Sequence, residues 1–255
     1  MNEEMTEKGE RRFSFKSIEE APHLAVLMEK PDDPLMPGFL FEDPGIVAYY
    51  QSRLWEIFPA YQIVITDEKD KGKPIGILNT MPLTWREPLE NLPGEGFDWA
   101  LGCPEMGGNW HCLMYGVIMP EYRGHGLSEK MLRFAKRMGQ ARGHQGTIAP
   151  VRPTRKQDFP HMPMEVYLDK RHEDGRVYDP WLRLHLSLGA RVIKVCHRSM
   201  TVRLPLDEWH KYGAVPSEEN QGELIVPGGL VPVKKIPDED IGLYEEPNVW
   251  MLHEY

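Results

Sequence analysis

Hydrophobic and polar residues change their spacing within a short central stretch, and this change is the clearest structural signal in the chain. Residues 112–119 (CLMYGVIM) form an apolar run that ends at Pro120, which is typical of a buried β-strand. Downstream of Leu127 the apolar residues recur every three or four positions, with lysine and arginine on the opposite side, as in an amphipathic helix. Residues 123–128 (RGHGLS) join the two segments. The pattern therefore predicts a strand, a glycine-containing turn and a helix in immediate succession.

Similar patterns predict the other elements. Asp43 followed by Pro44 is typical of a helix start. The residues expected on the buried face of that helix are Ile46, Tyr50, Leu54 and Ile57. Further helices are expected at Pro22–Glu29 and as a pair within Pro163–Leu188. The remaining strands are expected at Arg11–Ile18, Tyr61–Thr66, Ile75–Leu83, Thr147–Val151, Val192–Val195 and Ser199–Leu204. This order predicts a mixed α/β fold.

The turn has the composition of a phosphate-binding loop. Gly124 and Gly126 can adopt positive φ, which lets several backbone N–H groups converge, and the following helix adds the positive end of its dipole. A P-loop would require Gly-Lys-Ser/Thr and a dinucleotide fingerprint would require three spaced glycines, and both are missing from this turn. We predict a pyrophosphate site of another kind. A strand–helix turn without a ligand is the alternative.

The turn resembles the acyl-CoA signature of the GNAT superfamily of acyltransferases: Gln or Arg, two variable positions, Gly, one variable position, then Gly or Ala. Arg123 and Gly126 match the signature, and Ser128 stands where Gly or Ala is usual. The resemblance implies an α/β (α+β) GNAT fold, with a mixed, splayed central sheet flanked by helices, over about residues 11 to 205. It also implies acetyl-CoA or another acyl-CoA as co-substrate. The residues that would bind it are Val117, Ile118, Met119, Arg123, Gly124, His125, Gly126, Leu127 and Ser128, the first three through backbone N–H groups.

Pro150 fits the splay that this resemblance implies. Proline cannot donate to a strand ladder, so it suits a strand that is leaving its neighbour. In the GNAT fold the acyl-pantetheine arm enters the gap between two such strands. A simple strand end is the alternative explanation for Pro150.

His185 is the first candidate for proton transfer. It follows the helix start Asp179-Pro180, lies on the predicted inward face, and precedes Gly189 by four residues. In many GNAT enzymes a tyrosine at this position protonates the departing CoA sulfur, and an imidazole could do the same or act as a base. A core histidine bonded to a backbone carbonyl is the alternative. His111 and Tyr115 on the central strand are further candidates, with packing as their alternative.

A second resemblance concerns residues 179–185 (DPWLRLH) with Gly189-Ala190, which are similar to GNAT-like domains of polyketide-synthase loading modules. In those domains a threonine and a histidine support malonyl decarboxylation and S-acyl transfer to a carrier thiol. Thr154 and His185 would take these roles here, with Arg152 or Arg198 holding a carboxylate. Alternatively, the arginines are surface charges or contacts to CoA phosphates.

Three functions follow from these patterns. The first is an N-acetyltransferase that moves an acetyl group directly from acetyl-CoA to a small amine. The second is a GNAT-like malonyl decarboxylase or S-acyltransferase, and the third is a non-catalytic acyl-CoA-binding protein.

Domain organisation is expected to be simple for 255 residues. Residues 1–10 would form a flexible N-terminus and residues 11–213 the acyltransferase domain. Residues 85–110 are rich in Gly, Pro and aromatic side chains, which predicts a lid-like insertion over the acceptor side or, alternatively, plain packing. Residues 214–255 contain five prolines with many apolar residues, which predicts an extended arm that packs on the domain or on a partner subunit, and a homodimer could form through it.

Charge and composition limit the partners and the cellular compartment that we expect for this protein. The net charge of −9 argues against nucleic acid and mildly favours a cationic acceptor such as an amine. No apolar run approaches the ~20 residues of a membrane span, and residues 1–12 lack the apolar core of a signal peptide. The three cysteines are not spaced as metal ligands, so no metal is expected, and their odd number favours reduced thiols in a cytoplasmic protein.

Overall fold

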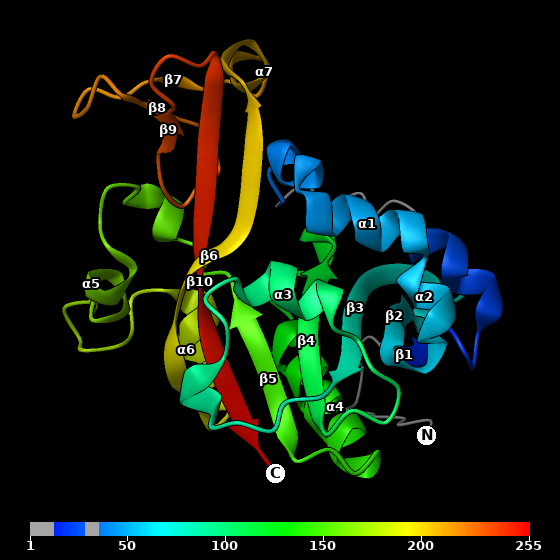
Figure 1. Cartoon of the computed structure of the whole chain (residues 1–255). Coiled ribbons are helices and arrows are strands. Elements are labelled where there is room, and N and C mark those ends of the chain that lie inside the picture. Colours follow the sequence, from blue (N-terminus) through cyan, green and yellow to red (C-terminus); the bar gives the residue numbers. More distant parts are fainter. Residues whose placement is uncertain (1–12, 29–35) are drawn as a thin grey trace.

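The computed structural model describes residues 13–28 and 36–255, in which ten strands form a single sheet. The strand order is β1-β2-β3-β4-β5-β10-β9-β8-β7, and β6 also pairs with β10 (Figure 1). The strands are β1 (Phe13–Ser17), β2 (Gln62–Asp67), β3 (Lys73–Leu83), β4 (Trp110–Ile118), β5 (Gly146–Val151), β6 (Ala190–Pro205), β7 (Val215–Pro216), β8 (Glu223–Ile225), β9 (Val233–Lys235) and β10 (Ile241–Glu254).

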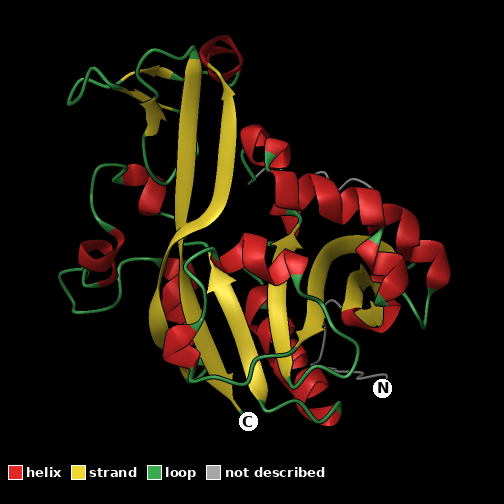
Figure 2. Cartoon of the chain, viewed as in Figure 1, coloured by secondary structure: helices red, strands yellow, loops and turns green. Residues whose placement is uncertain are grey.

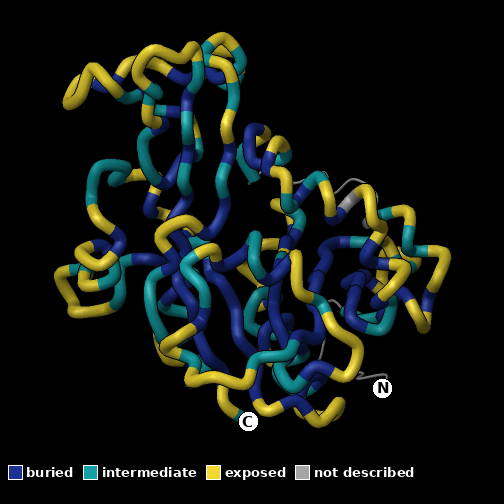
Figure 3. Tube along the Cα trace, in the orientation of Figure 1, coloured by how far each residue is buried: buried dark blue, intermediate teal, exposed yellow. Residues whose placement is uncertain are grey.

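Helices cover both faces of this sheet (Figure 2). The α-helices are α1 (Pro44–Ser52), α2 (Leu54–Ile57), α3 (Gly96–Gly102), α4 (Leu127–Ala141), α5 (Met164–Leu168), α6 (Pro180–Ser187) and α7 (Leu206–Lys211). Short 3-10 helices are η1 (Pro22–Met28), η2 (Gly38–Glu42), η3 (Pro59–Tyr61), η4 (Glu68–Asp70), η5 (Leu89–Asn91), η6 (Pro120–Tyr122) and η7 (Lys156–Asp158). Because β2 and β5 are covered on both faces, every residue in them is buried (Figure 3).

The first four strands form an antiparallel meander, as their alternating patterns predict. β1 pairs with β2, β2 forms a hairpin with β3 through the charged turn after Asp67, and β3 pairs with β4. α4 packs behind β4, where a methyl group on Gly116 would lie 2.8 Å from the Met131 side chain. α3 packs in front of the sheet (Figure 1).

β4 and β5 are parallel and diverge along their length, so the predicted splay is confirmed. Their register pairs are His111 with Thr147 and Cys112 with Ile148. We call this paired region the closed end of the sheet and the diverging part, residues 113–118 of β4, the open end. Pro150 lies beyond the last β4–β5 pair, opposite Trp250 of β10, as expected for a strand leaving its neighbour.

A β-bulge in β4 marks the start of the open end. Asn79 of β3 pairs with Tyr115, whereas the next residue, Thr80, pairs with Leu113. Met114 is therefore the extra residue on β4. A bulge locally disrupts the ladder and turns side chains in new directions. The sequence pattern of residues 112–119 predicts the strand but gives no sign of this irregularity.

The position of β10 corrects the expectation of a C-terminal arm. β10 runs antiparallel between β5 and β6, at the centre of the sheet. Residues 241–245 alternate between half-buried and buried, and residues 246–253 are all buried. Residues 206–240 form the small extension of α7, β7, β8 and β9 at the far end of the β6–β10 hairpin (Figure 1). The expected boundary at residue 213 thus falls inside a unit that β10 completes.

Some local expectations also differ. The helix after Asp43 breaks at Arg53, which has φ of +51°, so Ile57 lies in a separate turn and is 53% exposed. Residues 22–28 form a 3-10 helix, and residues 190–205 form one long strand with register irregularities opposite β10. The expected flexible residues 1–10, the strand start at residues 11–12, the helix end at Glu29 and the side chain of Tyr50 lie outside what the structure describes.

Candidate active site

The turn between β4 and α4 has the geometry expected of an anion-binding loop. Gly124 and Gly126 have φ of +80° and +70°, and no atom lies within 4 Å of the position that a Cβ would occupy on either residue. Among the described residues, the amides of residues 124–129 donate to no backbone carbonyl. His125 is exposed and Ser128 half-buried, while Leu127 is buried as the first residue of α4. Arg123 is fixed by a bond of 3.0 Å from its Nε to the Ile118 carbonyl. The turn therefore presents unpaired N–H groups at the start of a helix.

The outer edge of β4 is only partly available to a ligand. The Met119 N–H donates to the Ile75 carbonyl at 2.9 Å. It is therefore not free to bind acyl-CoA, contrary to the expectation from the sequence. Backbone N–H groups alternate sides along a strand, which directs Val117 toward β3 as well. The amides of Ile118 and Gly116 point instead toward the gap before β5.

A small pocket, about 30 Å³ in volume, adjoins the bulge on the face opposite α4. Its lining residues are Met36, Phe41, Ile46, Tyr49, Asn79, Leu101, Met114 and Tyr115. Tyr115 is half-buried and is the one candidate from the sequence analysis that lines this pocket. The walls come from Met36 just before η2 and from η2, α1, α3, β3 and β4, so the pocket exists only when these distant segments pack together.

Two carboxyl groups lie behind one wall of this pocket. Asp43 and Asp98 both accept the Thr201 N–H, at 3.0 and 3.1 Å, and Asp43 also accepts the Ile46 N–H at 3.0 Å. Burial and repulsion from Asp43 raise the pKa of Asp98 to about 8, and burial raises the pKa of Asp43. Two adjacent buried carboxylates cannot both ionise easily, so the pair holds a proton at neutral pH.

The carboxyl pair is next to the pocket. A methyl group on Gly45 would lie 3.1 Å from Asp43 Oδ1, 3.3 Å from Asp98 Oδ1 and 3.5 Å from Leu101 Cδ1. Leu101 lines the pocket, whereas neither aspartate does.

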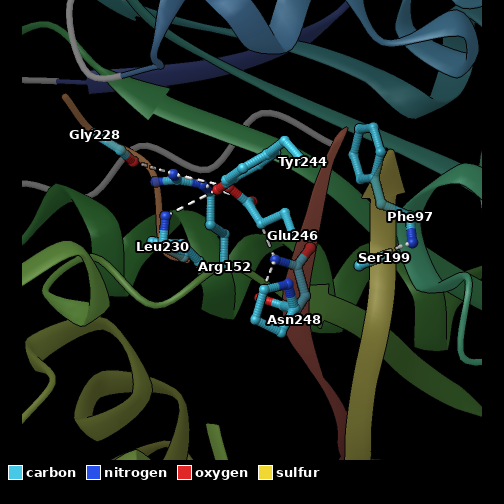
Figure 4. Close-up of polar contacts among 9 residues, drawn as sticks. Phe97, Arg152, Ser199, Gly228, Leu230, Tyr244, Glu246 and Asn248 are labelled. Carbon is cyan, nitrogen blue, oxygen red and sulfur yellow. Dashed lines mark hydrogen bonds and ion pairs between the residues drawn. The ribbon is translucent and has the colours of Figure 1, made fainter. Parts of the chain in front are cut away.

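Arg152 is committed to a buried ion pair (Figure 4). Its Nε and one terminal nitrogen donate to the two oxygens of Glu246 at 2.8 and 3.0 Å, and it also donates to the Gly228 carbonyl at 2.7 Å. Glu246 is fully buried and also accepts from the Tyr244 hydroxyl at 2.6 Å. Arg198 pairs with Glu95 and Arg155 with Asp158, both on the surface. Thr154 is exposed on the loop after β5.

His185 lies at the closed end of the sheet. It is 1% exposed, and its Nδ1 is 2.9 Å from Nε2 of His253. His253 pairs with Thr147 in β5, which in turn pairs with His111 in β4. His111 and Tyr115 are four residues apart, which is about 13 Å along a strand. The inward direction of His185 is therefore as predicted, but its partner is a side chain of β10, far from the bulge.

Burial explains the protonation state of these histidines. It lowers the pKa of His185 to about 3 and that of His253 to about 4, with a further contribution from Lys136 at His253. His253 also lines a cavity of about 190 Å³ between α4 and α6, together with Arg133, Lys136 and Arg137. An imidazole with so low a pKa is neutral at physiological pH and is a poor proton donor.

His111 belongs to a second polar cluster at the closed end. It is fully buried, its Nδ1 is 3.2 Å from the Thr147 hydroxyl, and Thr147 is 2.7 Å from the Tyr255 hydroxyl. Its ring stacks on His144, whose Nε2 is 3.0 Å from the Tyr61 hydroxyl. Burial, followed by the charges of His144 and Arg142, lowers the pKa of His111 to about 3. This geometry favours packing over catalysis.

The insertion of residues 85–110 contributes both to packing and to the pocket. Trp99 makes edge contacts with Trp85 and Trp250, and the Trp250 Nε1 donates to the Pro93 carbonyl at 2.9 Å. Its helix α3 supplies Leu101 to the pocket wall and Phe97 N–H to the Ser199 hydroxyl at 2.9 Å (Figure 4). A covering role over an acceptor stays a prediction.

Sequence reasoning missed Asn79 and the Asp43–Asp98 pair. Asn79 and Thr80 interrupt an otherwise apolar run, and that is a usable signal because buried polar residues need a partner. The sequence pattern predicts only a helix cap for Asp43, and Asp43 does fill that role. Nothing in the local sequence brings Asp98 beside it. No group of side chains suited to a metal ion occurs among the described residues, and none of the helices described is long and apolar enough to cross a membrane.

The known proteins that this chain resembles match nearly its whole length. No family model matches it. A curated relative, the arginine N-acetyltransferase avaD of Aspergillus versicolor, is 27% identical over 274 residues, covering 94% of this chain and 93% of the relative.

Among solved structures, the loading GNATL domain of CurA from Lyngbya majuscula has a TM-score of 0.57 at 19% identity, covering 95% of this chain and 97% of that one. The GphF GNAT-like decarboxylase in complex with isobutyryl-CoA has a TM-score of 0.56 at 16% identity, covering 95% of this chain and 98% of that one. These two structures identify the fold as the GNAT fold, as the sequence resemblance implied.

Proposed function

We propose that this acyltransferase of the GNAT fold moves an acetyl group from acetyl-CoA directly to a small amine. The observation that carries the proposal is the divergence of β4 and β5 beyond Cys112 and Ile148. The glycine turn, with its unpaired backbone N–H groups, lies at one side of this opening, and the pocket beside the bulge lies at the other. A thioester and an acceptor could thus meet at the bulge from opposite faces of the sheet.

The turn suits the pyrophosphate of CoA. Its amides and the start of α4 provide converging N–H groups and a positive dipole end. The empty space around Gly124 and Gly126 lets phosphate oxygens approach the backbone. The pantetheine arm would then follow the β4 edge, where the amides of Gly116 and Ile118 point toward the gap.

The chemistry requires little from the protein beyond positioning. The neutral amine nitrogen attacks the thioester carbon, a C–N bond forms and the C–S bond breaks. The nitrogen loses one proton and the departing thiolate gains one. Because a thiol has a pKa of about 8.5, protonating the thiolate is a modest demand. Tyr115, at the pocket beside the bulge, is our candidate for that proton donor.

The curated relative supports an amine acceptor. The name of that protein gives arginine, which carries a primary amine, as its acceptor. Arginine therefore belongs in any acceptor panel for this chain.

The decarboxylase alternative has less support in the side chains. It needs a guanidinium to hold a malonyl carboxylate, whereas Arg152 is paired with the buried Glu246 and Arg198 pairs with Glu95 on the surface. Thr154 is exposed and His185 lies at the closed end. The likeness to the GphF decarboxylase is one of fold.

One experiment separates the candidate functions. The protein is incubated with acetyl-CoA and a panel of primary amines, and separately with malonyl-CoA, while free thiol and CO₂ are measured. We expect amine-dependent thiol release from acetyl-CoA and no CO₂. Release of CO₂ from malonyl-CoA would establish the decarboxylase instead. Calorimetric binding of CoA without turnover of either thioester would establish a binding protein.

A further inference from the structure

Asn79 is a wall residue of the pocket, and its side chain carries an unpaired, buried oxygen. The residue is only 6% exposed, and its Nδ2 donates to the Tyr49 hydroxyl at 3.2 Å. The Oδ1 atom has no hydrogen-bond partner among the described residues. Asn79 lines the pocket and pairs in register with Tyr115, immediately before the bulge at Met114. The bond to Tyr49 holds the amide in place and leaves Oδ1 without a partner.

An unpaired buried atom is not by itself a sign of a ligand. Gln62 Oε1 on the neighbouring strand also lacks a partner, as do the Nε2 atoms of His111 and His185. None of these three residues lines the pocket. Asn79 is the member of this group that combines an unpaired acceptor with a pocket at the open end of the sheet.

The rest of the pocket wall is mainly apolar. Aliphatic and aromatic side chains of Met36, Phe41, Ile46, Leu101 and Met114 surround the space of about 30 Å³. Such walls favour hydrocarbon and disfavour charge, since an unpaired charge removed from water is costly.

The nearby carboxyl pair does not change this preference. Asp43 and Asp98 do not line the pocket, and both are engaged by the Thr201 N–H. Burial raises the pKa of both groups, with the pKa of Asp98 at about 8, so the pair carries less than its full negative charge at neutral pH. A cationic tail would therefore find no exposed carboxylate in the pocket.

We infer that Asn79 Oδ1 accepts a hydrogen bond from the acceptor nitrogen, and that the acceptor is a primary amine on a short apolar stem. The inference rests on the proposed function and specifies the substrate class of the same site. The nitrogen donates one N–H to Asn79, which holds it beside the thioester at the bulge in the ground state and in the transition state alike. The stem occupies the apolar pocket. Asn79 is thus a positioning and specificity-determining residue.

The first test uses the unaltered protein and compares acceptors at fixed acetyl-CoA. Ethylamine and propylamine represent short apolar stems, while arginine and 1,4-diaminobutane carry a second cationic group. We expect kcat/KM at least tenfold higher for the apolar amines. Equal or better use of arginine or the diamine would overturn the inference and leave the proposed acyltransferase function intact. If no amine releases thiol, the proposed function fails, and the inference fails with it.

The second test replaces Asn79 by leucine, which has a similar shape and no hydrogen-bonding groups. We expect KM for the apolar amine to rise about tenfold with kcat nearly unchanged, as for an interaction made in both ground and transition states. Calorimetric CoA affinity should stay within twofold, which also reports that the variant is folded. An unchanged KM in a folded Asn79→Leu variant would overturn the inference.

Gln62→Leu is the matched control. Gln62 is a buried amide with an unpaired oxygen that pairs in register with Asn79, but it does not line the pocket. The Gln62→Leu variant should be less stable than the unaltered protein but should have the same KM for the amine. An equal rise in KM in both variants would show a general disturbance of β2 and β3, which contradicts a specific contact by Asn79. If Asn79→Leu does not fold, the acceptor comparison still decides the inference.

Discussion

The open and closed ends of the β4–β5 pair carry similar polar side chains in different surroundings. At the closed end His111 and Thr147 lie within the sheet and His144 lies just before β5, and their side chains bond to one another, to tyrosines or, for His144, also to the Gly108 carbonyl. At the open end the turn amides and Asn79 Oδ1 lack protein partners and lie beside open space or a pocket. A histidine is therefore not a better catalytic candidate than an asparagine until its surroundings are known.

Protonation behaviour also differs between the two ends. Burial lowers the pKa of the closed-end histidines, so they are held neutral. At the open end, burial and mutual repulsion raise the pKa of the Asp43–Asp98 carboxyls, so that pair holds a proton. Both arrangements keep charge out of the interior, and they respond to pH in opposite directions.

The largest expected effect is at the glycine turn. Gly126→Val should reduce CoA affinity by at least about a hundredfold, because a β-branched side chain would fill the space where phosphate approaches the amides. Calorimetry measures the affinity. Gly143→Val at the other end of α4 is the control: Gly143 also has positive φ, +78°, and open space around its Cβ position. Equal CoA affinity in the two variants would remove the turn from the binding site.

The second prediction concerns His185. His185→Ala leaves His253 without its partner and should lower the stability by about 1–3 kcal/mol, which is a fall of roughly 2–12 °C in melting temperature. Turnover per folded molecule should stay within about twofold, since general acid–base catalysis is typically worth about 10² to 10⁴. Ser187→Ala, at an exposed position of the same helix, should change neither quantity. A hundredfold loss of kcat at unchanged melting temperature would make His185 the catalytic acid after all.

The third prediction uses pH to distinguish the ends. The histidines have folded pKa values of about 3 to 4 against an ordinary value of 6.5, so the unfolded chain binds protons first as pH falls. Their contribution to stability should be complete above about pH 6.5 and should decline by about 1.4 kcal/mol per histidine per pH unit below it. Urea unfolding between pH 7 and pH 4.5 measures this slope. His185→Gln should make it shallower, and an unchanged slope would contradict a buried neutral imidazole.

The carboxyl pair should respond in the other direction. The pKa of Asp98 is about 8 when folded and 3.8 ordinarily, so the folded state retains a proton that the unfolded state loses, and stability should fall as pH rises from about 4 to 8. Asp98→Asn needs no such proton and should raise the melting temperature more at pH 8 than at pH 5. Glu105→Gln, at an exposed carboxyl, is the control. The same shift at both pH values would mean that the pair does not share a proton.

The smallest expected effect is on the exposed face of α4. Lys130→Ala and Arg133→Ala should each weaken CoA binding about two- to threefold and flatten its salt dependence, because exposed charges act through screened attraction. Arg133 already pairs with Glu129, which limits its contribution. Arg176→Ala, which removes a similar exposed pair with Asp174, should have no effect. Unchanged salt dependence would show that these cations are only part of the solvated surface.

The sequence by itself determined the local elements. The apolar run at residues 112–119, the glycine turn and the amphipathic helix all form where the pattern predicts, and Asp179 caps α6 through the amides of Trp181 and Leu182. These features depend on a few neighbouring residues, on glycine at positive φ and on the spacing of apolar residues. The local sequence is therefore enough to predict them.

The tertiary structure alone decided which of these elements meet. β10 is buried on both faces over residues 246–253, which removes the alternation that identifies a strand, and its hydrogen-bonding partners are far away in sequence. That one placement puts His253 beside His185 at the closed end. Packing of α1, α3, β3 and β4 likewise makes the pocket in which Asn79 becomes significant. Backbone pairing and burial between distant segments depend on the whole chain, because any strand edge offers the same N–H and C=O groups.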